Sequence, residues 1–330
     1  MSENRFDVVG IGNAIVDVLA HADDRFIGEN DLIKGTMSLV DEAMAEAVYD
    51  KMGSGIECSG GSAANTIAAL ASLGSSGAFI GKVKDDQLGK VFRHDITSLG
   101  IAFETAPDND GASTARCMIH VTPDAQRTMQ TFLGACVNLG PDDIDEDMIA
   151  GSSITYLEGY LWDPEHAKQA FRKAARAAET SGRQVSLSLS DPFCVDRHRE
   201  DFLDLVKNHV NILFANEEEI MSLYRVEKFD DALQAVRADC DIAALTRSEK
   251  GSVVVRGDEV HIVDAERVEK VVDTTGAGDA YAAGFLHGLT QGLPLDECAR
   301  IGGICSAEVI SHVGARPDVS LKELVREKFA

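Results

Sequence analysis

The sequence predicts an α/β protein in which a central, mostly parallel sheet is covered by helices on both faces and carries a small β-rich lid. Strand-like apolar runs alternate with helix-like stretches along most of the chain, which is the pattern of parallel strands joined by helices. Two segments, about 13–50 and 101–135, interrupt the alternation and are expected to form the lid. No linker rich in proline, glycine or serine divides the chain, so residues 1–330 are expected to form a single domain.

Composition and charge argue against several functional classes. The chain has 55 acidic and 31 basic residues, a formal net charge of −24, so nucleic acid is not an expected partner. Its seven cysteines contain no CxxC pair, which argues against a disulfide framework or a structural zinc site. Neither a signal-peptide core nor a run of 18 apolar residues is present, so we expect a cytoplasmic protein with no membrane partner.

The first elements are expected to be strands around a glycine-rich turn. An apolar run at 6–11 predicts a buried strand, and residues 14–21 extend it. The stretch GGSAANTIAALASL at 60–73 predicts a turn that opens into an Ala-rich helix. Gly74 stands where the C-terminal cap of that helix belongs. A short strand is expected at 79–81.

Inside the second lid segment, two strand-like runs flank a turn. Residues 114–121 and 127–133 are separated by Pro123-Asp124-Ala125. Proline followed by aspartate is typical of a tight turn, so a β-hairpin is predicted.

The rest of the chain returns to alternation. Strands are expected at 154–160, 184–190, 211–214 and 242–246, and helices at 164–180, 196–208 and 230–238. A hairpin at 252–264, a long helix from about Gly278 and a last helix near 296–312 follow.

The start of the long helix carries the clearest chemical signal, Asp273-Thr-Thr-Gly-Ala-Gly-Asp279. Glycines before a helix let the backbone approach a ligand closely. The helix start presents N–H groups and the positive end of the helix dipole, which suits a transferring phosphoryl group. Asp279, ionised at neutral pH, can accept the proton of an attacking hydroxyl. Taken alone, the same residues also fit a plain turn with an acidic helix start.

A second motif makes this interpretation more specific. DTTGAGDAYAAGFL resembles the C-terminal signature of the PfkB carbohydrate kinases, which belong to the ribokinase-like superfamily, and Gly60-Gly-Ser-Ala-Ala-Asn65 resembles their N-terminal signature. The resemblance covers essentially the whole chain and implies an ATP-dependent kinase with a three-layer sandwich fold. It also implies that Asp279 is the catalytic base and that Gly276, Ala277 and Gly278 form the anion hole.

The resemblance further implies the residues that hold the acceptor. Gly61 and Asn65 of the N-terminal signature, together with Asp17, would hold its hydroxyls, because a carboxylate and a carboxamide together accept and donate hydrogen bonds. Asn13 and Asp17 lie in a segment similar to the first strand of adenosine kinases. Arg127 on the lid hairpin is expected to bind phosphate. The alternatives are a helix-start Asn65, an exposed Asp17 and a solvated Arg127.

Two later segments resemble the nucleotide and metal motifs of the family. Asn216 and Glu219 match a motif that organises Mg²⁺ and phosphate through water, although a helix cap explains the same residues. Thr246 and Gly251 match the nucleotide loop, where Ser248 replaces the usual glycine. ATP and Mg²⁺ are therefore expected cofactors, and K⁺ is a further candidate. The resemblance implies that residues 305–307 and 313–315 line the adenine pocket and a monovalent-cation site.

The acceptor is left open between two classes. The segments 12–17, 31–37 and 188–193 resemble adenosine kinases, so the 5′-hydroxyl of adenosine or a related ribonucleoside is expected; a ribose, fructose or other sugar is the alternative. A non-catalytic nucleoside sensor is a third possibility, and the incomplete GxGxxG at 10–15 makes a dinucleotide enzyme a poor fit. Tyr160 and Trp162 fit either base stacking or core packing. Monomer and homodimer both remain open.

Overall fold

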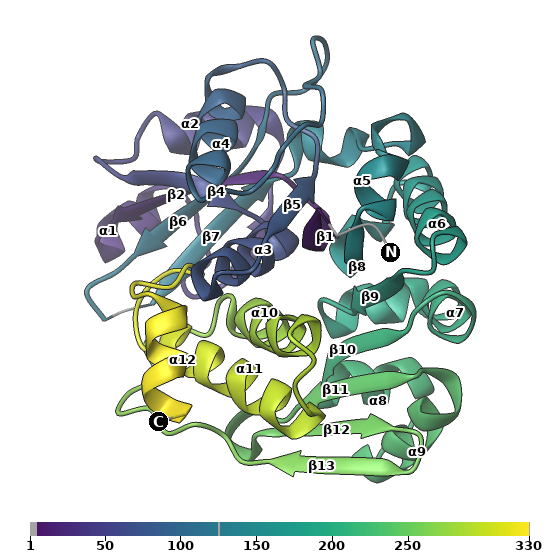
Figure 1. The fold of residues 1–330 in the computed structure, drawn as a ribbon. Coiled ribbons are helices and arrows are strands. Elements are labelled where there is room, and N and C mark those ends of the chain that lie inside the picture. Colours follow the sequence, from purple (N-terminus) through teal and green to yellow (C-terminus); the bar gives the residue numbers. More distant parts are fainter. Residues whose placement is uncertain (1–4, 125, 330) are drawn as a thin grey trace.

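The computed structural model describes residues 5–124 and 126–329, and within them the chain forms an eight-stranded sheet and a separate five-stranded sheet (Figure 1). The larger sheet has the order β13-β12-β11-β10-β9-β8-β1-β5. All neighbours from β5 to β11 are parallel, whereas β12 and β13 are antiparallel. Its strands are β1 (Phe6–Ile11), β5 (Gly77–Ile80), β8 (Ser152–Glu158), β9 (Gln184–Ser188), β10 (Ile212–Asn216), β11 (Ile242–Thr246), β12 (Ser252–Arg256) and β13 (Glu259–Val263).

Helices cover both faces of the larger sheet, so the fold has three layers and the expected α/β class is confirmed. The strands are apolar on both faces because both faces are buried; Val8 points into one core and Val9 into the other. One layer contains α3 (Ser62–Leu73), α4 (Gln87–Ser98), α10 (Ala277–Thr290), α11 (Leu295–Val309) and α12 (Leu321–Phe329). The other contains α5 (Glu146–Ala150), α6 (Glu165–Thr180), α7 (Pro192–Asn208), α8 (Glu217–Tyr224) and α9 (Phe229–Asp239).

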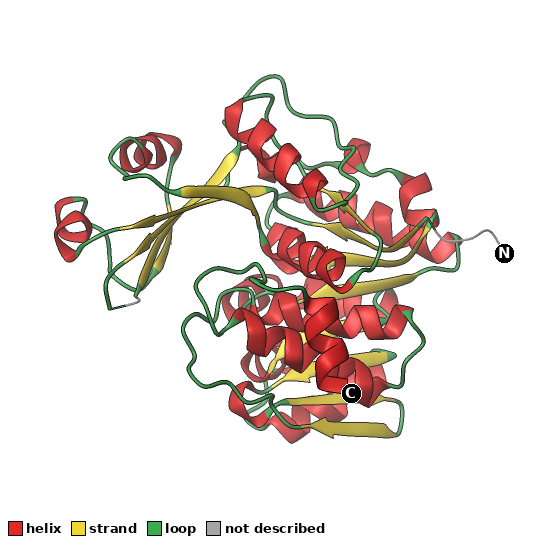
Figure 2. Ribbon diagram, turned by 60° about the vertical axis from the view of Figure 1, so that its left-hand side comes forward, coloured by secondary structure: helices red, strands yellow, loops and turns green. Residues whose placement is uncertain are grey.

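The smaller sheet projects from one side of the layers built on the larger sheet (Figure 2). Its order is β3-β7-β6-β2-β4. It is formed by β2 (Ile15–His21), β3 (Met37–Leu39), β4 (Ile56–Gly60), β6 (Ala115–Val121) and β7 (Arg127–Phe132). Strand β2 follows β1 after three residues, so the two sheets are joined close to the carboxyl end of β1.

The first lid segment differs from the sequence prediction in two ways. It contains two helices, α1 (Asp24–Glu29) and α2 (Glu42–Tyr49). Each begins at an aspartate N-cap, Asp23 and Asp41, whose carboxylate accepts a backbone N–H, a signal visible in the sequence. In addition, β4 belongs to the smaller sheet although it lies beyond residue 50.

The second lid segment begins later than predicted. Ala102 pairs with Ala78 of β5, so residues near 101 belong with the larger sheet, and the smaller sheet resumes only at Ala115.

Other boundaries shift for local reasons. Strand β8 ends at Glu158 and is followed by the 3-10 turn Gly159–Trp162. Helix α7 begins at Pro192, four residues earlier than expected, because Asp191 caps it and proline suits the first helical position. Further 3-10 turns are Gly134–Asn138, Pro141–Asp143 and Ser248–Lys250.

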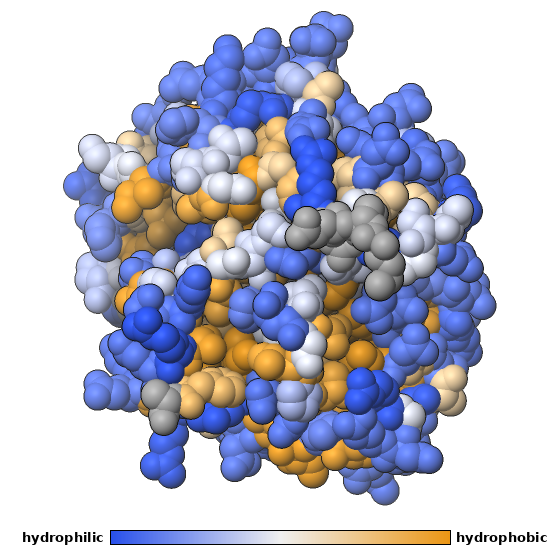
Figure 3. All heavy atoms as spheres, viewed as in Figure 1, coloured by the Kyte–Doolittle hydropathy of each residue, from blue (hydrophilic) through white to orange (hydrophobic). Residues whose placement is uncertain are grey.

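The face seen in Figure 1 is largely hydrophilic, with apolar patches toward its lower half (Figure 3). Among the exposed apolar side chains are Val260 and Ile262, which belong to the edge strand β13. No helix in the described part of the chain is long and apolar enough to cross a membrane.

Candidate active site

The start of α10 is held in a conformation that requires glycine. Gly276 is the N-cap and has φ 75°, in the left-handed region. A Cβ placed there would lie 2.7 Å from the Cβ of Ala315, whereas a Cβ on Gly278 would meet no atom within 4 Å. The turn is therefore tightly packed at Gly276 and open at Gly278, which leaves room for a ligand at the helix start.

Asp273 fixes the loop that leads into this helix. Its carboxylate accepts the N–H of Thr275 at 2.6 Å and the N–H of Gly314 at 2.8 Å. Within the turn, the N–H of Ala277 donates to the carbonyl of Thr274 at 3.2 Å. Of the three amides expected in the anion hole, that of Ala277 thus already has a partner.

Asp279 lies in the first turn of α10 and faces the start of α3. Its carboxylate accepts hydrogen bonds from Ser62 Oγ at 2.6 Å and from Asn65 Nδ2 at 3.4 Å. Burial raises the pKa of Asp279 to about 6, and the two hydrogen bonds oppose that rise. The carboxylate remains mostly ionised at neutral pH and is a stronger base than an exposed aspartate.

The two residues expected from the N-terminal signature lie at this same point. Gly61 has φ 97°, and a Cβ there would lie 2.1 Å from the carbonyl oxygen of Asn13. Asn65 is buried, and its Oδ1 has no hydrogen-bond partner among the described residues. A buried acceptor without a partner is uncommon in native proteins, so Asn65 is well suited to take a ligand hydroxyl.

Asn13 is placed differently from the expectation. Its Nδ2 donates to Glu158 Oε1 at 2.7 Å, and its Oδ1 accepts from the thiol of Cys136 at 3.0 Å. The side chain is 3% exposed and both of its polar ends are bonded within the protein. This geometry fits a residue that positions its neighbours better than one that contacts the acceptor directly.

Glu158, at the carboxyl end of β8, is a site residue that the sequence analysis missed. Its other oxygen, Oε2, accepts the N–H of Ala63 at 2.8 Å, which ties β8 to the start of α3. Burial raises its pKa to about 7. A glutamate that ends a buried strand in YLEGYLW was the available signal, because side chains at the carboxyl ends of parallel strands meet at one edge.

Asp17 comes from the smaller sheet and lies against the backbone of Gly60, where a Cβ would be 2.3 Å from its Oδ2. Burial raises the pKa of Asp17 to about 7, although the charge of Arg316 opposes the rise. The nearby Asp279 raises it further. The charges of Asp17, Asp279 and Arg316 therefore act on one another at the junction of the two sheets.

Arg127 connects the hairpin of the smaller sheet to the loop before α10. Its guanidinium forms an ion pair with Asp273, whose side chain is fully buried. Arg127 Nη1 is buried and has no partner among the described residues. The residue is thus not a solvated hairpin side chain; it lies beside the expected phosphate loop with one donor available.

The expected nucleotide residues lie on neighbouring strands. Asn216 and Thr246 are paired in register at the ends of β10 and β11. Ser248 has φ 51°, and Gly251 has φ 81°, so the serine occupies a left-handed position at which glycine is favoured. Ser248 therefore adopts a backbone conformation that a glycine would adopt without strain.

Asn216 and Glu219 form a reciprocal helix cap. Glu219 Oε2 accepts the N–H of Asn216, and Asn216 Oδ1 accepts the N–H of Glu219, both at 2.9 Å. Burial raises the pKa of Glu219 to about 7. Both carboxylate oxygens of Glu219 already accept hydrogen bonds from Asn216, so these two residues fit Mg²⁺ contact through water better than direct coordination.

The aromatic side chains that could stack on a base differ in their exposure. Trp162 is fully buried and packs on Phe171 and Phe202, so base stacking by this residue is excluded in this conformation. Tyr160 is 40% exposed, and Phe193, at the start of α7, is 74% exposed. An exposed aromatic side chain just beyond the carboxyl end of β9 is available to a ligand.

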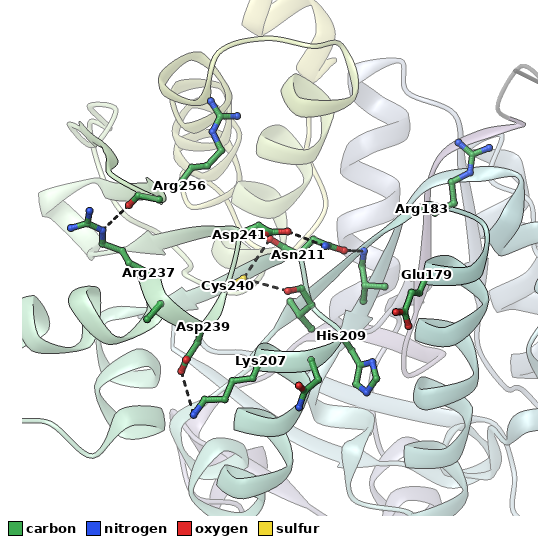
Figure 4. Close-up of a pocket in the computed structure, with 15 residues that line it drawn as sticks. Glu179, Arg183, Lys207, His209, Asn211, Arg237, Asp239, Cys240, Asp241 and Arg256 are labelled. Atoms are coloured by element: carbon green, nitrogen blue, oxygen red, sulfur yellow. Dashed lines mark hydrogen bonds and ion pairs between the residues drawn. The ribbon is translucent and has the colours of Figure 1, made fainter.

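A cavity of about 760 Å³ lies at the opposite edge of the larger sheet (Figure 4). Its lining includes residues that precede β9, β10 and β11, such as Arg183, His209 and Asp241. The labelled cationic side chains point in different directions rather than toward a common centre. This cavity is separate from the site around Asp279.

Comparison with known proteins agrees with this geometry. Residues 37–322 match the pfkB family carbohydrate kinases. An adenosine kinase structure from Sinorhizobium meliloti is 52% identical, with a TM-score of 0.90, and covers 98% of this chain and 99% of its own. A probable sugar kinase structure from Rhizobium etli CFN 42 is 48% identical, with a TM-score of 0.91 and 99% coverage of both chains.

A more distant sequence relative has similar coverage. The adenosine kinase of Saccharomyces cerevisiae is 26% identical over an alignment of 335 positions that covers 93% of this chain and 95% of the relative. The similarity therefore extends over both sheets.

Proposed function

The chain belongs to the pfkB family of carbohydrate kinases and is an ATP-dependent kinase, and we propose that its acceptor is the 5′-hydroxyl of adenosine or a related ribonucleoside. The observation that carries the choice of a nucleoside is the apolar face of the smaller sheet beside Asp17. A sugar alone would need hydroxyl partners, whereas a nucleoside also needs an apolar surface for its base.

This apolar face follows from strand register. Leu19 is paired with Ile119, and Ile119 with Met129, so their side chains lie on the same face as Asp17. These residues pack together with Ile15 and with Val313, which lies in the loop after α11. The exposed ring of Phe193 adds an aromatic surface near the carboxyl edge of the larger sheet. In this proposal these side chains hold the base while Asp17 and Asn65 hold the ribose hydroxyls.

The proposed chemistry centres on Asp279. Its carboxylate takes the proton of the 5′-hydroxyl as that oxygen attacks the γ-phosphorus of ATP, while the bond from that phosphorus to the bridging oxygen breaks and ADP leaves. ATP would supply the phosphoryl group, and a Mg²⁺ ion bound with it would neutralise part of the phosphate charge. The helix start, which is open at Gly278, offers the N–H groups of Gly276 and Gly278 to the developing charge, and Arg127 offers its free donor from the smaller sheet.

The remaining nucleotide residues have supporting roles in the proposal. Thr246 and Gly251 would contact the nucleotide, while Asn216 and Glu219 would order the water shell of Mg²⁺. A K⁺ ion held by backbone carbonyls near 313–315 is proposed as an activator, to be tested by adding the ion to the assay. A sugar acceptor is the second candidate, because the relative from Rhizobium etli, 48% identical, is named as a probable sugar kinase.

ADP release with MgATP tests the proposal directly. The acceptors are adenosine, inosine, guanosine, ribose and fructose, each assayed with the wild-type chain and with Asp279→Asn. We expect adenosine to give the highest kcat/KM, and the variant to lose roughly 10²- to 10⁴-fold in kcat, the usual contribution of a general base. A clear preference for a sugar would contradict the nucleoside proposal, and unchanged turnover in the variant would contradict the role of Asp279.

A further inference from the structure

Arg316 is an arginine at the junction of the two sheets that the family motifs do not explain. It lies in the loop after α11, and its Nη2 donates to the carbonyl oxygen of Ser59 and to Ser59 Oγ, the latter at 2.9 Å. Ser59 is in turn held by Asp95, which accepts its N–H at 2.8 Å and its hydroxyl at 2.6 Å. One end of the guanidinium is therefore fixed to the backbone of β4.

The other donors of this guanidinium have no partner. Arg316 Nε and Nη1 are both buried, and no hydrogen-bond acceptor contacts them within the described part of the chain. Leaving charged donors buried and unpaired is costly, so two such donors on one side chain indicate that an acceptor atom comes from a ligand.

The position of Arg316 indicates which ligand this is. Ser59 immediately precedes Gly60, the residue against which the carboxylate of Asp17 lies. The positive charge of Arg316 acts on both Asp17 and Asp279, lowering the pKa of each against the larger effect of burial. The guanidinium, held at Ser59, thus lies in the neighbourhood of the carboxylates that we assign to the ribose hydroxyls and to the reacting hydroxyl.

We propose that Arg316 is a specificity-determining residue, whose Nε and Nη1 donate to the oxygens of the vicinal ribose hydroxyls while Asp17 accepts their protons. A hydroxyl both donates and accepts, whereas a guanidinium only donates and a carboxylate only accepts. The pair therefore matches two neighbouring hydroxyls and does not match a methylene group in their place. This inference rests on the ribonucleoside function proposed above.

The consequence is selection against deoxy acceptors. An acceptor that lacks one hydroxyl leaves a buried charged donor unpaired. A site that binds a hydroxyl discriminates strongly against an analogue without that hydroxyl, whereas an apolar pocket discriminates only weakly against a ligand that lacks one methylene. We therefore expect 2′-deoxyadenosine or 3′-deoxyadenosine to be a much poorer acceptor than adenosine.

The test is a specificity ratio. kcat/KM is measured for adenosine, 2′-deoxyadenosine and 3′-deoxyadenosine with the wild-type chain, with Arg316→Met and with the control Arg300→Met, which removes an exposed arginine of α11. Arg316→Met should lower the value for adenosine about 10- to 100-fold and the values for the two deoxy acceptors by a clearly smaller factor, since adenosine loses two charged hydrogen bonds and each deoxy acceptor only one. The control should leave all three values unchanged.

A purely structural role gives a different result. If Arg316→Met lowers all three values by the same factor, the specificity role is wrong. If that variant does not fold, protection of the wild-type chain from thermal unfolding decides instead, because equal protection by adenosine and both deoxy analogues would overturn the proposal. If adenosine is inactive and a sugar is phosphorylated, the nucleoside function fails, while the same ratio for that sugar and its deoxy form still decides the role of Arg316.

Discussion

At the scale of single residues, the site is built from carboxylates that burial makes more basic. The pKa of Asp279 is raised to about 6, and those of Asp17 and Glu158 to about 7. Each carboxylate is balanced by hydrogen bonds or by a positive charge, so none is a lone buried anion. A base with a pKa near the working pH is both ionised and able to hold a proton, which is the condition for efficient general-base catalysis.

The raised pKa of Asp279 predicts the acid limb of the pH profile. Only the ionised carboxylate can take a proton, so kcat/KM for the acceptor should fall as the pH drops below about 6. Ser62 Oγ donates to this carboxylate and stabilises its ionised form. Ser62→Ala should therefore raise the pKa and move the limb by roughly 1 pH unit toward higher pH.

The matched control is Ser98→Ala, whose hydroxyl donates to a backbone carbonyl on α4. It should leave the profile in place. An acid limb that stays fixed in Ser62→Ala would show that another group controls it.

Site residues could be predicted from the sequence where they belong to a local sequence motif. Asp279, Gly61 and Asn65 lie in local motifs, and the structure brings them together. Glu158 and Arg316 could not be found in this way, because each is a single residue whose meaning depends on segments far away in the chain. Only the folded arrangement places Arg316 beside Ser59, across 257 positions.

At the scale of elements, the start of α10 contains one glycine that packs against the protein and one that faces open space. Gly276 has a positive φ and packs on Ala315, whereas Gly278 is helical and its Cβ position is open. Two glycines two positions apart are thus required for different reasons, and substitution can distinguish them.

Gly276→Ala should destabilise the chain by about 1–3 kcal/mol, because alanine is strained at this φ and would clash with Ala315. Gly278→Ala should keep or raise stability, by up to about 1 kcal/mol, since alanine favours a helix. It should nevertheless lower kcat/KM for ATP at least about tenfold, because its methyl group enters the proposed phosphoryl space. Denaturant midpoints and ADP release give the two readouts.

Gly28→Ala is the control for this pair, because Gly28 is an exposed helical glycine of α1 with no atom within 4 Å of its Cβ position. Gly28→Ala should change the stability of the chain by about as much as Gly278→Ala does, and it should leave kcat/KM for ATP unchanged. If Gly278→Ala is as active as this control, the helix start is not the phosphoryl site.

Elements of the larger sheet were predictable because their apolar runs are continuous; β11 and β1 have the expected bounds. Helices α1 and α2, which pack on the smaller sheet, were not predicted because they are short and because the segments around them have the pattern of β-strands. Their aspartate N-caps were visible, but an aspartate before a short helix also suits a turn. Pairing of β4 with β2 is a long-range contact that no local pattern specifies.

At the scale of the whole molecule, the smaller sheet is covered on its outer face by helices of its own chain. Phe26 of α1 packs on His120, and Ala45 and Val48 of α2 pack on Met118. Helix α4 covers β4 through the bonds of Asp95 to Ser59. Figure 2 shows helices beside the strands of this projecting sheet. The inner face is the one that we assign to the acceptor.

This arrangement leads us to propose that the chain is a monomer. A dimer formed through the smaller sheets would need an uncovered apolar face of about 800 Å² on each partner, the size of a standard stable interface. The outer face is already buried, and use of the inner face would close the proposed acceptor site. Light scattering after size exclusion should give a mass near that of one chain, 35.4 kDa, at all concentrations and with or without adenosine. A mass that doubles with concentration while activity is retained would contradict the proposal and indicate an interface elsewhere, with the exposed edge strand β13 and its Val260 and Ile262 as the first surface to test.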